Sequence, residues 1–346
     1  MNAFTKSDIN LVICHDCITF VPKQQPISAK VSEKRNMKIA FLISAHTDAI
    51  HLKRLIEALP QSAYFYIHLD CKADMKVFKQ TVINESPHSH EKKPHICFIK
   101  ERYNIMWGSF GQVRYQMALL KRALQDMPDY FISISGLDYP LWPNEKILAF
   151  IESHQHKNML QAICLADHKE HARLYEEYRF FNEHFWPYHS LKSKFRASIR
   201  HIIRLLGFRK PLVVKTDKAC RKLYKGGSWW GINRDLAQYV MSVWENEPSF
   251  AQYFHNSFGP DETFVHTIAF NSQYKDSCIE SNPEHANLVD LSPLTHIDYR
   301  DQIKVFTETD FDELIASGKM FCRKVITGKS NQLMDLIDNY RKHSHP

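Results

Sequence analysis

Two adjacent carboxylates, Asp261 and Glu262, follow Gly259 and Pro260 and precede an apolar run that ends at Ile268. A carboxylate held close to a substrate hydroxyl can remove its proton as a general base. The pattern also has a purely structural interpretation, because proline favours the first position of a helix and acids in the first turn complement the helix dipole. The residue types alone favour this structural interpretation, with a helix beginning at the acids.

The positive charge of the chain is concentrated in one segment. The whole sequence carries a net charge of +7, whereas residues 189–225 contain twelve Lys or Arg and a single acid, Asp217. This segment therefore carries +11 and the remainder −4. Residues 191–204 alternate apolar and basic side chains at helical spacing, which predicts an amphipathic helix. Three interpretations stay open: a helix on an anionic membrane surface, a solvated face over the core, or a contact with an anionic glycan.

The elements that must position the acids follow a regular alternation. Short apolar runs typical of buried strands alternate with helical patterns in the first half of the chain. This order predicts an α/β fold, a mostly parallel twisted sheet with helices on both faces, whose ligand site lies at the carboxyl ends of the strands. The predicted strands are 37–46, 63–70, 95–100 and 129–135, and the predicted helices between them are 48–59 and 110–124.

The loops after these strands carry polar residues that a plain connection does not need. They comprise residues 44–48, 68–74, 101–109 and 135–142. The sequence contains no G-x-G-x-x-G, no P-loop and no G-x-S-x-G, which argues against a dinucleotide enzyme, a P-loop nucleotidase and an α/β-hydrolase. The basic segment is likewise unaccompanied by a recognised nucleic-acid-binding module, so no nucleic-acid partner is expected.

The metal-ligand patterns in the chain are weak. Cys14 and Cys17 form a single C-x-x-C with no second pair, and the eight cysteines are scattered, as is usual for reduced thiols. A D-x-D string, Asp310 to Asp312, opens a short predicted helix, where a capping role is favoured over metal binding. We expect a loosely ordered extension over residues 1–36, a catalytic domain over 37–330, and a C-terminal helix and tail over 331–346.

Six blocks of sequence stand out along the chain: HLD at 68–70, WGSFGQVRYQMALLKRAL at 107–124, DYFISISGLDYPLWPNEKILAFI at 129–151, GGSWWGINRDLAQYV at 226–240, GPDETFVHTI at 259–268 and GKMFCRKV at 318–325. They occur in the order seen in glycosyltransferase family 14, which the chain resembles over about residues 37–330. This family holds the core-2/I-branching β-1,6-N-acetylglucosaminyltransferases and the peptide O-xylosyltransferases. The resemblance implies a GT-A-like fold, an inverting transfer from a UDP-sugar, and no divalent metal or other cofactor.

The resemblance also assigns roles to residues. Glu262 matches the catalytic base of the family, which reverses the interpretation favoured by the residue types alone, and Asp261 is expected to orient or to contact the sugar. Lys324 matches the diphosphate-binding lysine of the family. Its neighbour Arg323 should point to the opposite face of a strand. The upstream arginine of the family has no clean match, and His296 and Arg300 are the candidates, of which Arg300 is taken as the diphosphate-binding residue.

The remaining candidates surround the expected donor and acceptor. Residues of the strand-end loops are placed to meet the nucleotide and the donor: Ile43, His46, Asp70, Trp107, Ser135, Gly136 and Asp138. Trp229 and Trp230 offer flat faces for a sugar, with one of the two expected in the core because strand neighbours face opposite ways. Arg173 and Glu177 are the weaker acceptor candidates.

Taken together, the sequence predicts an inverting, metal-independent glycosyltransferase that moves GlcNAc or xylose from a UDP-sugar to a hydroxyl of a glycan or glycolipid. The alternative within enzymes is transfer of xylose to a serine, and the alternative of another class is a non-catalytic glycan- or membrane-binding protein. No signal anchor is recognised at the N-terminus, which favours a bacterial-type, cytoplasmic protein, peripheral at the inner face of the membrane if residues 189–225 bind lipid.

Overall fold

The computed structural model describes residues 9–14, 17–22, 37–84, 94–281, 284, 287, 289–299 and 302–344. The chain divides into two units, Met1–Asn36 and Met37–Pro346. In the first unit, β1 (Ile9–Cys14) and β2 (Cys17–Pro22) pair as an antiparallel hairpin. The sequence analysis did not anticipate this hairpin, because positions 15 and 16 carry neither Gly nor Asn, the usual signals of a two-residue turn.

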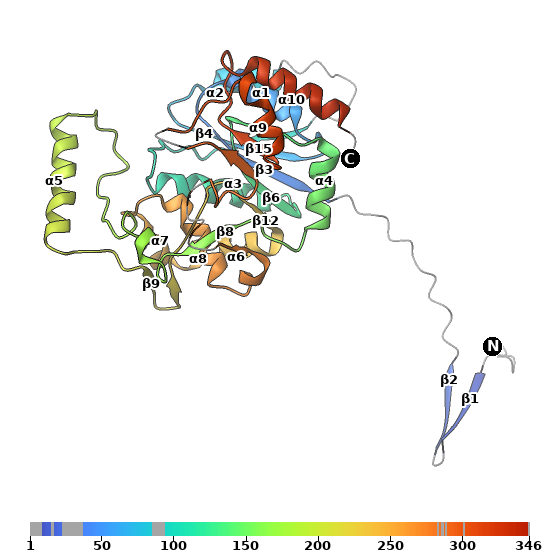
Figure 1. The fold of residues 1–346 in the computed structure, drawn as a ribbon. Coiled ribbons are helices and arrows are strands. Elements are labelled where there is room, and N and C mark those ends of the chain that lie inside the picture. Colours follow the sequence, from blue (N-terminus) through green and yellow to red (C-terminus); the bar gives the residue numbers. More distant parts are fainter. Residues whose placement is uncertain are drawn as a thin grey trace. The chain divides into compact units, whose positions relative to one another are not determined.

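A five-stranded sheet forms the centre of the second unit (Figure 1). Its order is β12-β6-β3-β4-β5, with β3 to β6 parallel and only β12 antiparallel, at one edge. The predicted parallel sheet is thereby confirmed. The continuous apolar runs arise because the central strands are buried on both faces. The strands are β3 (Ile39–Ala45), β4 (Tyr64–Leu69), β5 (His95–Phe98), β6 (Tyr130–Ser135) and β12 (Gly231–Asn233).

Helices cover both faces of this sheet, as the alternation predicts. Alternate residues of β3 separate the two sides: Ala40 and Leu42 join one hydrophobic cluster, and Phe41 and Ile43 join the other. The first cluster is closed by α3 (Gly111–Leu124), α6 (Arg234–Asn246), α7 (Pro248–Phe254) and α8 (Phe264–Phe270), and the second by α1 (Ala49–Ala58), α2 (Met75–Lys79) and α4 (Asn144–Ser153).

A smaller sheet brings the C-terminal segment beside the central one. Its order is β14-β15-β7, in which β15 runs parallel to β14 and antiparallel to β7. The pairing places Arg323 opposite Asp138, residues 185 positions apart in the sequence. A third hydrophobic cluster lies under this sheet and includes side chains of the last helix. The elements are β7 (Asp138–Pro140), β14 (Thr295–Ile297), β15 (Phe321–Arg323), α9 (Phe311–Ala316) and α10 (Asn331–His343).

Two further small sheets complete the strands of the second unit. β11-β8-β13 make a three-stranded sheet and β9-β10 a hairpin. A Cβ at Gly226 in β11 would collide with the ring of His266 and the carbonyl of Gln161, so only glycine permits this close approach. The bounds are β8 (Gln161–Cys164), β9 (Val213–Lys215), β10 (Cys220–Lys222), β11 (Tyr224–Gly226) and β13 (Ile279–Glu280).

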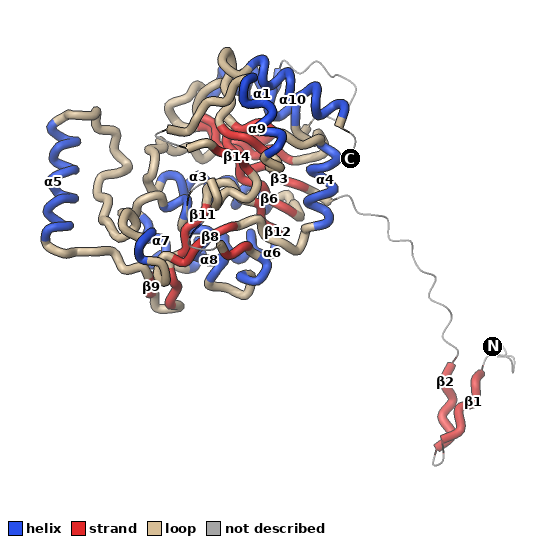
Figure 2. Tube along the Cα trace, in the orientation of Figure 1, coloured by secondary structure: helices blue, strands red, loops and turns tan. Residues whose placement is uncertain are grey.

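Helix α5 (Leu191–Leu205) stands apart from the other helices, with a long loop on either side (Figure 2). None of its residues is buried. Ser190 caps the helix by accepting a hydrogen bond from the backbone of Ser193 at 3.1 Å. In the part of the chain that the structure describes, α5 and every other helix are too short or too polar to cross a membrane.

Candidate active site

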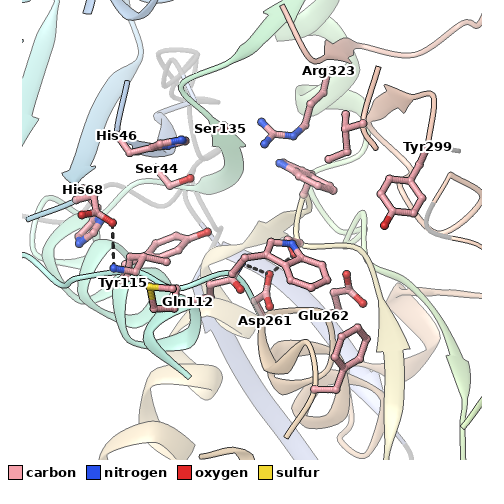
Figure 3. Close-up of a pocket in the computed structure, with 18 of the residues that line it drawn as sticks. Ser44, His46, His68, Gln112, Tyr115, Ser135, Asp261, Glu262, Tyr299 and Arg323 are labelled. Atoms are coloured by element: carbon pink, nitrogen blue, oxygen red, sulfur yellow. Dashed lines mark hydrogen bonds between the residues drawn. The ribbon is translucent and has the colours of Figure 1, made fainter. Parts of the chain in front are cut away.

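A cleft of about 1360 Å³ opens at the carboxyl ends of the parallel strands. The end of β3 contributes Ser44 and His46, the end of β4 contributes Asp70, and the end of β6 contributes Ser135. The opposite wall carries the carboxylate of Glu262 (Figure 3). The cleft therefore lies where a parallel α/β sheet is expected to bind its ligand.

The two acids belong to a tight turn rather than to the start of a regular α-helix. Gly259 has a φ of 48°, and Pro260–Glu262 form one 3₁₀ turn before α8 begins at Phe264. Asp261 is only 4% exposed. Its Oδ2 accepts hydrogen bonds from Gln112 Nε2 at 2.9 Å and from Ser228 Oγ at 2.5 Å. Asp261 therefore joins the walls of the cleft together and is unsuited to deprotonating a substrate.

Glu262 is held by a different partner. The hydroxyl of the buried Tyr175 donates to Glu262 Oε2 at 2.8 Å. Burial raises the pKa of Glu262 to about 7, assisted by the negative charge of Asp261 and opposed by the charge of Lys225 and the bond from Tyr175. Burial also raises the pKa of Asp261, to about 6. A carboxylate with a pKa near neutrality has the strength that a general base needs in neutral solution.

A fixed cation faces the same cleft from β15 (Figure 3). Arg323 Nη1 donates to Asp138 Oδ1 at 2.9 Å, and the guanidinium carbon lies 4.9 Å from the centre of the Trp229 ring. Asp138 is fully buried, so its carboxylate needs this partner. The Nε of Arg323 is buried without a hydrogen-bond partner in the described structure. An anion in the cleft would supply that missing acceptor.

The neighbouring lysine lies outside the cleft lining. Lys324 is half-buried, and its pKa is lowered by burial and by the charges of Arg323 and Lys329. Its backbone bonds to Lys304 and Phe306. Arg323, the last residue of β15, lines the cleft, whereas Lys324 follows the strand and does not line it. Arg300, the third diphosphate candidate, lies outside the described residues.

Most of the predicted donor residues line the cleft. His46 lies at its edge, where burial and the charge of Arg323 lower the pKa of its imidazole. The carboxylate of Asp70 accepts bonds from the backbone of Lys72 at 2.8 Å and of Ile105 at 2.9 Å, which fixes the loop after β4. Trp107 also lines the cleft and is 76% exposed. Its wide exposure suits a side chain that is covered only when a ligand binds.

Other predicted site residues have structural positions. Ile43 is fully buried in the core, because its side chain points into the hydrophobic cluster under α1, α2 and α4 rather than into the cleft. Trp230 is fully buried, whereas its neighbour Trp229 lines the cleft. Both precede β12, which begins at Gly231, so they differ as expected but lie outside a strand. Gly136 donates a backbone hydrogen bond to Ser44 at 2.8 Å and holds two strand ends together.

The two weaker acceptor candidates are also away from the cleft lining. Arg173 is exposed, and Glu177 forms an ion pair with Arg179 at 2.8 Å. Both belong to the segment that supplies Tyr175, so the sequence analysis located the segment and not the residue. Asp138, expected beside the donor, acts on the cleft through Arg323 instead.

Several cleft residues were missed by the sequence analysis. Tyr175 and Lys225 flank Glu262, with the lysine Nζ 5.7 Å from the centre of the tyrosine ring. Gln112 and Ser228 hold Asp261. Gln112 and Ser228 stand inside blocks already quoted for the family resemblance, which was the available signal. Tyr175 lies in a loop dense in aromatic residues, where no periodicity distinguishes it.

Among the described residues, no group of three or more His, Cys, Asp or Glu side chains is arranged to hold a metal ion. Asp310 of the D-x-D string closes a capping box with Thr307 and bonds to Lys304 Nζ at 2.6 Å. It therefore has the capping role that the sequence favoured. Cys14 and Cys17 are partners in the strand register of the β1–β2 hairpin.

Comparison with known proteins places this fold and cleft in a family. The model of the core-2/I-branching enzyme family matches residues 39–315. The chain belongs to this family, which is a family of glycosyltransferases. It is 24% identical to xylosyltransferase 2 of Rattus norvegicus over 94% of this chain and 36% of the relative. It is 26% identical to xylosyltransferase sqv-6 of Caenorhabditis briggsae over 75% of this chain and 30% of the relative.

The chain thus spans only part of these curated relatives, about a third of their length. Among solved structures, a glycosyltransferase involved in the glycosylation of the major capsid of PBCV-1 is similar, with a TM-score of 0.31 and 12% identity. That match covers 88% of this chain and 99% of the other.

Proposed function

We propose that the protein is an inverting glycosyltransferase of GT-A type that transfers GlcNAc or xylose from a UDP-sugar to a hydroxyl group, with Glu262 as general base and without a divalent metal. Glu262 takes the proton of the acceptor hydroxyl while the acceptor oxygen attacks C1 of the sugar. The bond between C1 and the diphosphate oxygen breaks on the opposite face, and UDP leaves with the electron pair. This displacement inverts the configuration at C1.

The observation that carries the proposal is the environment of Glu262. Its carboxylate lines the cleft, receives one hydrogen bond from Tyr175, and has a pKa raised by burial to about 7. A structural acid at a helix start would have its charge stabilised by the helix dipole, which lowers a pKa. The raised pKa of Glu262 therefore supports its role as a general base, which accepts the proton of the acceptor hydroxyl in each turnover.

Arg323 supports the second half of the proposal. The leaving diphosphate gains negative charge as the bond to C1 breaks, and a fixed cation can stabilise that charge in place of a metal ion. Arg323 lines the cleft and is held by Asp138, and its unpaired Nε offers a further donor. Lys324, the match to the lysine of the family, remains a candidate for a second contact from the position just after β15.

The identity of the donor sugar has two candidates. The names of the relatives favour xylose, since the matches in Rattus norvegicus and Caenorhabditis briggsae are both xylosyltransferases. The resemblance to core-2/I-branching β-1,6-N-acetylglucosaminyltransferases, set out in the sequence analysis, favours GlcNAc. Trp229, whose ring is covered by Arg323 on one side, is the flat surface against which we expect the donor sugar to pack.

The proposal is tested by measuring UDP release from UDP-GlcNAc, UDP-xylose, UDP-glucose, UDP-galactose and UDP-GalNAc in the presence of EDTA. Slow hydrolysis of one donor by the wild type is expected. The Glu262→Gln variant should bind UDP as tightly as the wild type does. Its rate of UDP formation from the donor should be ~10²–10⁴-fold lower. A protein that binds no UDP would refute the proposal and favour a non-catalytic glycan-binding protein. Near-native turnover of the variant would remove Glu262 from the mechanism.

A further inference from the structure

The outward face of α5 is apolar, which is the reverse of a normal surface helix. Four of its side chains recur at helical spacing and lie on one face: Leu191, Phe195, Ile202 and Leu205. Leu191 is 84% exposed and Leu205 71%, and even the least exposed of the four, Ile202, is 53% exposed. Leu206 and Phe208 extend the same apolar surface beyond the end of the helix. We call this surface the α5 stripe.

The less exposed side of α5 is mixed, with Arg196 and Arg200 beside Ile199 and Ile203. Arg196 Nη1 lies 3.4 Å from the carbonyl oxygens of Phe181 and of His184, to both of which it donates. The guanidinium of Arg196 also lies over the ring of Trp186 at 5.4 Å. The α5 stripe itself is exposed, so α5 does not cover the core with its most apolar face.

Positive charge borders the α5 stripe. Lys192 and Lys194 are exposed beside Leu191, and neither forms an ion pair with a described residue. Arg204 is exposed near the other end of the helix. The surrounding residues 189–225 carry a charge of +11, so a second copy of the same surface would be repelled. An apolar stripe with basic borders fits an anionic lipid surface, which accepts both the side chains and the charges.

We propose that the α5 stripe docks onto an anionic lipid surface. The stripe enters the boundary between headgroups and acyl chains, while Lys192 and Lys194 contact the headgroup phosphates. Two exposed aromatic residues, Phe185 and Tyr188, lie in the segment just before α5, and Phe185 lines the cleft. If the proposed function holds, an acceptor carried in the same lipid surface reaches Glu262 from the side of Phe185.

The test is co-sedimentation of the full chain with vesicles of phosphatidylcholine alone and of an equimolar mixture with phosphatidylglycerol. The wild type should bind only the anionic vesicles, and salt should weaken the binding. Combining Lys192→Glu with Lys194→Glu should reduce partitioning at least about 30-fold. The matched control, Lys76→Glu with Lys79→Glu on α2, changes two other exposed lysines and should bind as the wild type does.

A second pair of variants tests the apolar part. Combining Phe195→Ser with Ile202→Ser should also reduce partitioning at least about 30-fold. Its control, Val77→Ser with Leu336→Ser, changes exposed apolar residues of α2 and α10 and should have no effect. Equal binding by stripe variants and wild type would overturn the proposal. A second result would also overturn it: the wild type does not bind vesicles, and sedimentation velocity shows a dimer that the stripe variants dissociate.

Measuring UDP binding in the same samples separates the two proposals. A protein that binds UDP and ignores anionic vesicles overturns the lipid surface and leaves the transferase intact. A protein that binds anionic vesicles through the α5 stripe and fails to bind UDP overturns the transferase proposal and leaves the lipid-surface proposal intact.

Discussion

Replacing Tyr175 by phenylalanine deletes one oxygen atom and with it the hydrogen bond to Glu262. A hydrogen bond to a charged partner is worth ~1.5 kcal/mol at the lower end of its range. Since 1.36 kcal/mol corresponds to roughly one pKa unit, the pKa of Glu262 should rise from about 7 to about 8. The lower end applies because Tyr175 is the smallest of the stated influences on this carboxylate.

The sign of the effect on rate follows from the role of a base, which works only when it is deprotonated. At pH 7 the deprotonated fraction falls from roughly one half to roughly one tenth, so kcat/KM should fall about fivefold. At pH 9 both proteins are mostly deprotonated, and the variant should approach the wild type. The assay is UDP release as a function of pH with the preferred donor.

A matched control separates the pKa from general damage to the fold. Tyr130→Phe removes another buried tyrosine hydroxyl, one that donates to the Lys157 carbonyl at 3.0 Å and lies outside the cleft lining. It should leave the pH profile unchanged. A Tyr175→Phe enzyme that is slower by the same factor at every pH would show that Tyr175 positions the base without tuning it. An unchanged profile would show that Glu262 is not the titrating group.

Further predictions concern the neighbours of Glu262 and the cation. Asp261→Asn removes a negative charge and should move the acidic limb of the pH profile to lower pH, the direction opposite to Tyr175→Phe, as the same assay would record. Arg323→Gln should slow UDP release ~10²–10³-fold and should also lower the melting temperature, because it leaves the buried Asp138 carboxylate without its cation. Asp138→Asn should lower the free energy of unfolding by about 3 kcal/mol in urea titrations, because it leaves a cation without its partner in a buried site. EDTA should leave turnover unchanged, whereas a loss restored by Mn²⁺ would contradict the metal-free mechanism.

The parallel sheet and its helices could be predicted because their signal is local. The buried strand β3 is a continuous apolar run, and the amphipathic period of α3 is visible in the sequence. An assumed strand alternation predicted that one of Trp229 and Trp230 is core and that one of Arg323 and Lys324 faces the cleft. Both tryptophans and Lys324 in fact lie outside the strands. Alternation could not decide which member of each pair does so, because that depends on the elements packed on either side.

The environment of Glu262 could not be predicted, because it depends on contacts between distant segments. Tyr175 is 87 positions from Glu262, and Gln112 is 149 positions from Asp261. Neither contact leaves a periodic pattern in the sequence. The outward orientation of the α5 stripe was equally inaccessible, since the same sequence of apolar and basic residues suits a helix that covers a core.

The pairing of β7 with β15 sets an order of events during synthesis. Asp138 leaves the ribosome 185 residues before Arg323, a delay of roughly 10–40 s at ordinary rates of translation. Throughout this interval the Asp138 carboxylate has no guanidinium to neutralise it, and burying it alone would be costly. The region around β7 must therefore stay open to water until β15 emerges. Nascent chains arrested between these two strands should be cut by proteases near β7, while chains that extend past β15 are protected.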